Sequence, residues 1–182
     1  MIFLDTCVWI ELLSVRTPEK EHEIRQARAA TELLETIMSN EKKIVTCKEQ
    51  MIELVTAIEK VTMRTVNSER KANKLSGIGS LKEFRTLPEF ENTKILCETV
   101  IKDLKYFAEI NDIGDYDVDD ILRRLDLADI NDCLYYDYCV REKIDFYTFD
   151  SDLEKLGDNS VLHKYSVDQS KWLQSGAGTK RI

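Results

Sequence analysis

The sequence predicts an α/β fold: an α/β/α sandwich with a central parallel sheet, rich in helix and carrying helical insertions. Only 6 Gly and 2 Pro occur in 182 residues, which favours long regular elements over a turn-rich β-sandwich. Hydrophobic residues make up 43% and charged residues 33%, which excludes disordered and collagen-like chains. Short apolar runs alternate with amphipathic stretches, as in a parallel sheet covered on both faces by helices. We expect residues 1–182 to form a single domain.

The first strands and helices follow from apolar runs and their spacing. Ile2–Leu4 is a short apolar run that suits a buried parallel strand, and residues 8–13 are predicted as a short helix. Residues 44–46 are predicted as a second strand, followed by a helix over 48–61. One face of that helix carries Met51, Leu54, Val55 and Ile58 at helical spacing.

A long helix is predicted over residues 17–40. Thr17 is the expected N-cap and Pro18 suits the first helical position. Its apolar stripe repeats at close to 3.5 residues: Ile24, Ala27, Thr31, Leu34 and Met38. This stripe predicts packing along another helix, either within the chain or in a second subunit.

The second half of the chain is predicted to be mostly helical. Residues 67–92 are polar and contain Gly77, Gly79 and Pro88, and there we expect a helix, a loop and an irregular connection. The further helices are predicted over 93–110, 118–125, 130–142 and 151–156, and the further strands over 146–149 and 160–163. We expect residues 62–125 to elaborate the domain with helices and loops, and residues 175–182 to be a flexible tail.

Composition and charge narrow the classes of function. No apolar run approaches the ~20 residues of a membrane span, and the N-terminus lacks the basic region of a signal peptide. The five cysteines are odd in number and form no C-x-x-C pair, so we expect reduced thiols in a cytoplasmic protein. A net charge of −8 opposes bulk charge-driven binding of nucleic acid. It still permits a nucleic-acid enzyme whose acidic residues gather around metal ions.

Carboxylates stand at the predicted ends of strands and starts of helices. Asp5 follows the first strand, Asp150 follows a later one, Asp132 lies in the first turn of a helix, and Glu53 lies early in another. Ligands of open α/β sheets gather outside the carboxyl ends of the strands. Converging carboxylates would repel one another, and hard oxygen ligands suit Mg²⁺ or Mn²⁺. Taken singly, each of these acids is better explained as a solvated or helix-capping residue among the 34 Asp and Glu, and the case for metal ligands depends on their sequence context.

In context, these segments resemble the PIN-domain ribonucleases, and in particular the VapC-like toxins of toxin–antitoxin pairs. The opening segment 2–10, with Asp5-Thr6, resembles that family's first strand and catalytic Asp. The family often has Ser where this chain has Cys7. Segment 132–139 resembles its third-acid helix, and the T-x-D-x-D element appears as Thr148-Phe149-Asp150-Ser151-Asp152. Glu53 resembles the family's second acid.

The resemblance implies metal-dependent hydrolysis of RNA. The residues it assigns to catalysis and to one or two Mg²⁺ or Mn²⁺ ions are Asp5, Glu53, Asp132 and Asp150. Asp152 is either a further metal ligand or a helix cap. Thr6 and Thr148 are expected to orient carboxylates or water. Asp129 lies one turn before Asp132, where it either caps the helix or supports the site.

The substrate and partners are predicted less sharply. Between Ile58 and Arg85 seven basic residues face three acidic ones, so the segment either tracks RNA phosphates or is an ordinary solvated face. The residues expected to bind RNA are Lys60, Arg64, Arg70, Lys71 and Lys74. The resemblance implies an antitoxin partner and a homodimer. Two other functions remain open: an RNA-maturation nuclease of the same fold without an antitoxin, and a catalytically silent scaffold that binds RNA or protein.

Overall fold

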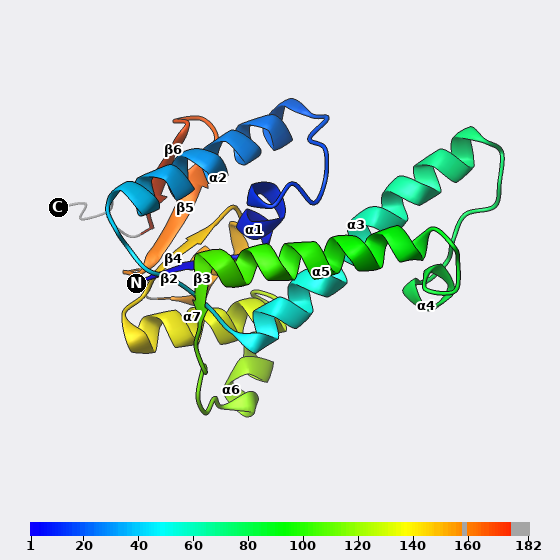
Figure 1. The fold of residues 1–182 in the computed structure, drawn as a ribbon. Coiled ribbons are helices and arrows are strands. Elements are labelled where there is room, and N and C mark those ends of the chain that lie inside the picture. The colour runs from blue at the N-terminus through cyan, green and yellow to red at the C-terminus, as the bar shows by residue number, and fades with distance from the viewer. Residues whose placement is uncertain (158–159, 176–182) are drawn as a thin grey trace.

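The computed structural model describes residues 1–157 and 160–175 and contains a six-stranded sheet flanked by helices (Figure 1). The spatial order is β3-β2-β1-β4-β5-β6. The strands are β1 (Ile2–Leu4), β2 (Ile44–Thr46), β3 (Ala108–Ile110), β4 (Asp145–Thr148), β5 (Leu162–Ser166) and β6 (Lys171–Gln174). The first five strands pair in parallel and β6 is antiparallel to β5. This arrangement confirms the predicted α/β/α class.

Helices cover both faces of the sheet. They are α1 (Thr6–Leu12), α2 (Glu21–Ser39), α3 (Lys48–Ala72), α4 (Leu81–Phe84), α5 (Phe90–Phe107), α6 (Val118–Arg123), α7 (Ile130–Glu142) and the 3₁₀ helix η1 (Asp152–Leu156). Because successive side chains of a strand point to opposite faces of the sheet, β1 contributes side chains to two separate hydrophobic cores. Phe3 packs with the buried side chains of α7, whereas Ile2 and Leu4 pack with those of α1, α2, α3 and α5.

Two strands at the edges of the sheet differ from prediction. The predicted helix 93–110 ends at Phe107, and the next three residues pair with β2 as β3, with Ala108 opposite Ile44. The predicted strand 160–163 is β5 over 162–166, and β6 was not predicted. Each edge strand is short and mixes polar with apolar residues, so its own sequence does not specify a strand. Pairing with the neighbouring strand stabilises it instead. The expectation that residues 62–125 only elaborate the domain was therefore wrong for β3.

The long helix α2 begins later than predicted. It starts at Glu21, and Thr17 is not its N-cap: the Glu23 carboxylate accepts hydrogen bonds from the backbone amides of Glu19 and Lys20 at 3.0 and 3.1 Å. Its buried residues are Ala29, Ala30, Leu33 and Ile37. The predicted stripe is not this buried face, since Ile24 and Met38 at its two ends are 44% and 57% exposed.

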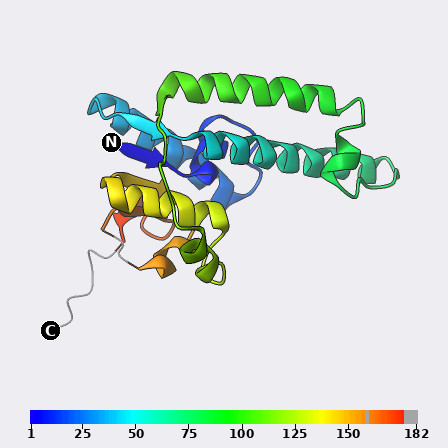
Figure 2. The same ribbon diagram turned by 90° about the horizontal axis from the view of Figure 1, so that it is seen from below.

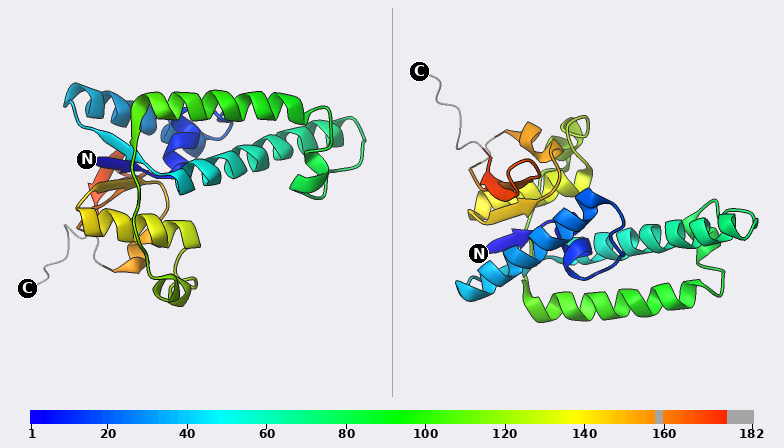
Figure 3. Two further views of the ribbon diagram at one scale, coloured as in Figure 1. Left: turned by 60° about the horizontal axis from the view of Figure 1, so that its bottom comes forward. Right: turned by 90° about the horizontal axis from the view of Figure 1, so that it is seen from above.

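Helix α3 is much longer than the predicted 48–61, because it continues to Ala72. Its second half leaves the sheet and lies beside α5, and the two helices extend outward as an arm (Figures 2 and 3). The fully buried Phe84 of α4 packs edge-on against Phe90. The buried carboxylate of Glu59 accepts two hydrogen bonds from Arg85. These contacts replace the sheet as the support for the outer part of α3.

The remaining boundaries differ from prediction by a few residues. Helix α7 was predicted correctly at 130–142. Helix α1 covers 6–12 in place of 8–13, α6 covers 118–123 in place of 118–125, β4 covers 145–148 in place of 146–149, and η1 covers 152–156 in place of 151–156. The predicted flexible tail falls, beyond Ser175, outside the described residues. In the described ranges we find no helix with both the length and the apolar character needed to cross a bilayer.

Gln50 joins the ends of two central strands to α3. Its side chain is fully buried, its Nε2 donates to the carbonyl of Leu4 at 2.8 Å, and its Oε1 accepts from the hydroxyl of Thr46 at 2.8 Å. Both partners are the last residues of their strands. This side chain therefore sets where the first turns of α3 lie relative to the sheet.

We predict that Gln50→Leu destabilises the fold. The substitution leaves the buried Leu4 carbonyl and Thr46 hydroxyl unsatisfied, at a cost of about 1–3 kcal/mol for each unpaired group. Urea denaturation measures the free energy of unfolding. Gln26→Leu on α2, a half-buried position, is the matched control and should change stability by less than about 1 kcal/mol. Equal stability of the two variants would contradict the role given to Gln50.

Candidate active site

Two carboxylates stand beyond the carboxyl ends of neighbouring strands. Asp5 directly follows β1, and Asp150 lies two residues beyond the end of β4. The strands pair in parallel with Leu4 opposite Tyr147, so both carboxylates emerge at the same edge of the sheet. This is the edge at which ligands of open α/β sheets bind.

Asp132 lies at the centre of the carboxylate cluster. It occupies the first turn of α7. Burial raises the pKa of Asp132 to about 8, and the negative charges around it add to this shift. In order of influence, these charges belong to Asp5, Glu53, Asp150 and Asp129. The structure therefore brings together all four acids predicted to be catalytic, with Asp129 beside them.

Two side chains donate hydrogen bonds to Asp5. The Thr148 hydroxyl donates to Oδ2 of Asp5 at 2.5 Å, and the Cys7 thiol donates to the same oxygen at 3.1 Å. The backbone amide of Asp150 in turn donates to the Thr148 hydroxyl at 2.9 Å. Burial raises the pKa of Asp5 although these bonds act to lower it. Both side-chain donors engage Oδ2, and the backbone of Thr6 forms a further hydrogen bond with the carboxylate.

Glu53 is positioned by one threonine and faces one buried tyrosine. The Thr6 hydroxyl donates to Oε2 of Glu53 at 3.0 Å. Burial raises the pKa of Glu53, while its interaction with the Tyr135 hydroxyl acts to lower it. Tyr135 lies one turn after Asp132 on α7 and is fully buried, and its hydroxyl lacks a well-formed hydrogen bond. The two threonines expected to orient carboxylates, Thr6 and Thr148, both have the geometry for that role.

A polar cavity of about 210 Å³ opens beside Asp132. Its acidic lining includes Asp129, Asp132, Asp150 and Asp152. Asp129 occupies the N-cap position of α7 without a capping bond from its side chain. The amide of Asp152 donates to Oδ1 of Asp150 at 2.8 Å, while its carboxylate pairs with Lys155 at 2.6 Å. Lys155 thus brings a positive charge to the rim of an acidic cavity.

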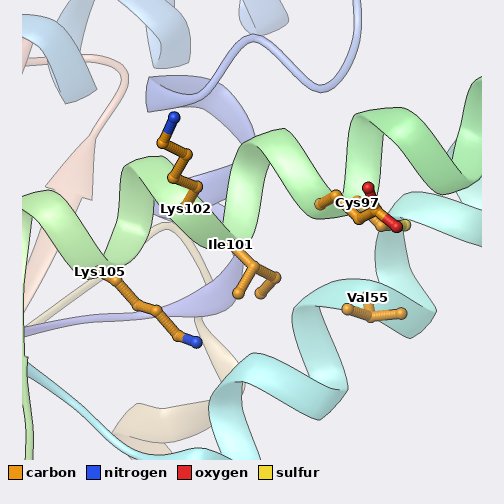
Figure 4. A pocket seen from close by; sticks show the side chains of 6 residues that line it. Val55, Cys97, Ile101, Lys102 and Lys105 are labelled. Carbon is orange, nitrogen blue, oxygen red and sulfur yellow. The ribbon is translucent and has the colours of Figure 1, made fainter.

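A larger cavity, of about 460 Å³, lies elsewhere, between α3 and α5 (Figure 4). Val55, Cys97 and Ile101 form its apolar lining, and Lys102 and Lys105 stand at its border. It contains none of the clustered carboxylates. We therefore place the candidate active site at the smaller cavity, where charged groups converge.

The donor set fits a hydrated divalent cation. Within residues 1–157 and 160–175, no three His, Cys, Asp or Glu side chains already form a closed set of metal ligands. Mg²⁺ usually keeps several waters and takes only one or two carboxylates directly, so a closed set is not required. Buried carboxylates whose mutual repulsion raises the pKa of Asp132 are what a cation would stabilise.

Three contributors to this site were not assigned a role by the sequence analysis. The sequence analysis noted Cys7 only because the family it resembles often has Ser at this position, yet the Cys7 thiol donates a hydrogen bond to Asp5. Tyr135 is a buried core residue, and its hydroxyl also approaches Glu53. Lys155 lies five residues after Asp150, and only the turn of η1 brings it back to the cavity. In the sequence, the i, i+3 spacing of Asp152 and Lys155 was the feature that could have predicted their ion pair.

We predict that Asp132→Asn stabilises the metal-free protein at alkaline pH. The pKa of Asp132 is raised in the folded state, so the folded chain holds this proton more tightly than the unfolded chain. Ionisation therefore costs stability as pH rises from about 4 through about 8. In EDTA at pH 8.5 the variant should melt about 2 °C or more above the parent. At pH 5, near the lower end of this range, the gain should be much smaller.

Scanning calorimetry at both pH values provides the measurement. Asp103→Asn, at an exposed position on α5, is the control for removing one charge and should show no such pH dependence. A parent and an Asp132→Asn variant with parallel stability curves between pH 5 and 8.5 would show that Asp132 is not crowded by other carboxylates.

Comparison with known proteins identifies one family. A family model described as PIN domain matches residues 2–159. This match includes β1, the first turns of α3, the start of α7 and the segment after β4. No curated protein and no solved structure matches the chain.

Proposed function

The chain belongs to the PIN domain family, a family of nucleases, and from this premise we propose that it is a metal-dependent endoribonuclease that hydrolyses phosphodiester bonds of RNA. One observation carries the proposal: four acids from four separate segments converge at one edge of the sheet. There, burial and the charges of the neighbouring acids raise the pKa of Asp132 to about 8. Such crowding is costly unless the site binds a cation.

Asp5, Glu53, Asp132 and Asp150 would hold one or two Mg²⁺ or Mn²⁺ ions, directly or through water. Such an ion lowers the pKa of bound water and stabilises charge on the phosphate. Asp152 was expected to be either a ligand or a cap. Its amide bond to Asp150 and its ion pair with Lys155 favour a supporting role.

The other side chains at the site fix geometry and charge. Thr148 and Cys7 direct Asp5 by occupying one of its oxygens, and Thr6 holds Glu53 in place. Fixed donors of this kind keep ligand oxygens oriented before substrate arrives. We propose that the Lys155 ammonium pairs with a phosphate oxygen of the RNA, because it is the cation that lines the acidic cavity.

We predict that Asp132→Asn abolishes most of the cleavage activity. It removes one negative charge from the proposed metal site and keeps the shape of the side chain, so RNA cleavage should fall by a factor of at least about 100. Cleavage of a panel of labelled RNAs, measured with Mg²⁺ and with Mn²⁺, provides the test.

Asp103→Asn should cleave at the rate of the parent. A fully active Asp132→Asn variant would remove this residue from catalysis. If the parent itself cleaves no RNA with either metal but still binds RNA, the catalytically silent scaffold is the better assignment.

We further propose that this nuclease is the toxin of a toxin–antitoxin pair acting on cytoplasmic RNA. The motifs at Asp5, Asp132 and Asp150 that resemble VapC-like toxins support this more specific assignment. Exposed Ile24 and Met38 on α2 offer apolar surface on which an antitoxin or a second copy of the chain could pack. The alternative is an RNA-maturation nuclease of the same fold.

Growth of a bacterial host separates these two functions. We predict that induced expression of the parent arrests growth within one or two generations, and that Asp132→Asn, expressed at the same level, does not. Co-expression of a small protein encoded next to this gene should restore growth. Cleavage activity in vitro without any growth arrest would favour the maturation nuclease.

A further inference from the structure

The outer part of α3 carries a row of basic side chains that begins near the candidate active site. We infer that this row, formed by Lys60, Arg64 and Lys71, binds the phosphates of an RNA strand that leads to the carboxylate cluster. The inference rests on the proposed ribonuclease function and specifies its substrate: an RNA with a continuous segment on one side of the scissile bond.

The helical register aligns the row with Glu53. Lys60, Arg64 and Lys71 follow Glu53 by 7, 11 and 18 residues on the same uninterrupted helix. At 3.6 residues per turn these intervals are close to two, three and five full turns, so all four side chains lie along one side of α3. All three basic residues are exposed. The nearest positions between them in the row are Thr56, Ala57, Asn67 and Ser68, none of which is acidic.

The basic residues of the arm divide into paired and unpaired groups. Arg85 is paired with the buried Glu59, while Arg70 lies near Glu89 and donates to the carbonyl of Ser76. Among the described residues, Lys60, Arg64 and Lys71 have no ion-pair partner. Arg70, expected to bind RNA, is thus occupied within the arm, whereas the row keeps its charge available. Lys74 lies beyond the end of α3, at the tip of the arm.

The arm is built to hold this row at a fixed distance from the sheet. The side chain of Asn67 bonds both the amide and the carbonyl of Ile78, at 2.7 and 3.1 Å, and so fastens the loop after α3 to the helix. Together with Phe84 and the Glu59–Arg85 pair, this contact ties the outer half of α3 to the segment that returns to α5. Figure 2 shows the two helices extending together beyond the sheet.

The length of the row sets the size of the RNA segment. Eighteen residues of helix span about 27 Å, and a stacked nucleic-acid strand carries one phosphate per ~3.4 Å. This span is measured from Glu53 to Lys71. The path from the carboxylate cluster to the end of the row therefore accommodates about eight nucleotides of a stacked strand and fewer of an extended one. In a chain with a net charge of −8, such a localised basic surface would also orient the RNA relative to the acidic cavity.

Charge reversal along the row tests the inference. The row variant combines three substitutions: Lys60→Glu, Arg64→Glu and Lys71→Glu. The matched control reverses three exposed basic residues on α2 and α5: Arg28→Glu, Lys102→Glu and Lys105→Glu. Each is compared with the parent on RNAs of about 4 and about 20 nucleotides that contain the same cleavage site. A milder variant, with Gln at the three row positions, guards against disruption of the helix by charge.

We expect the row reversal to lower kcat/KM for the long RNA at least about 10-fold and to leave the short RNA nearly unchanged. Binding of the long RNA, measured in an Asp132→Asn background so that no cleavage occurs, should lose about two units of its log–log salt slope. The Gln variant should show a smaller loss in the same direction. The control should keep both the rate and the salt slope.

An undiminished rate on the long RNA, or equal losses for the row and control variants, would overturn the inference. So would a loss that is the same for short and long RNA, since the row would then act on the site itself. A parent that cleaves neither RNA would instead contradict the proposed function, and binding of the long RNA in the Asp132→Asn background would still decide whether the row binds RNA.

Discussion

Repulsion among carboxylates at the end of a parallel sheet is the constraint on which the rest of the site depends. Asp5 is almost completely buried and Asp132 lies within reach of three further acids. Neither position is favourable for a carboxylate without compensation. The Thr148 hydroxyl and the Cys7 thiol offset part of that cost at Asp5. Nearby, Thr6 donates to Glu53 and Lys155 pairs with Asp152. In the proposed function, a divalent cation supplies the remaining compensation.

The fold makes this crowding possible because β1 lies at the centre of the sheet. Both of its neighbours are parallel to it, so the segments following β1, β2 and β4 all emerge at one edge. Its alternating side chains are shared between two cores, with Phe3 on one face and Ile2 and Leu4 on the other. Gln50 then links β1 to the start of the helix that carries Glu53. Packing energy from both cores therefore holds the acids together.

Helix α3 separates the two kinds of charge that a ribonuclease needs. Its first turns lie against the sheet and place Glu53 in the acidic cluster, whereas its outer turns carry the basic row on the same side of the helix. The arm supports the outer turns through a buried ion pair and aromatic packing in place of the sheet. One continuous helix can thus connect catalysis with the binding of substrate.

The sequence by itself determined the α/β class, the central strands and the four acids, because buried apolar runs and carboxylates at strand ends are local patterns. Helix α7 was predicted to the residue. Only the tertiary structure decided that residues 108–110 and 171–174 are strands, since neither segment has an apolar run and each depends on a neighbouring strand. It also decided that Cys7, Tyr135 and Lys155 adjoin the acids. In the part of the chain that the structure describes, Arg70 is paired with Glu89, whereas Lys60 has no ion-pair partner. Such contacts join segments far apart in the chain, or depend on a turn that local sequence does not specify.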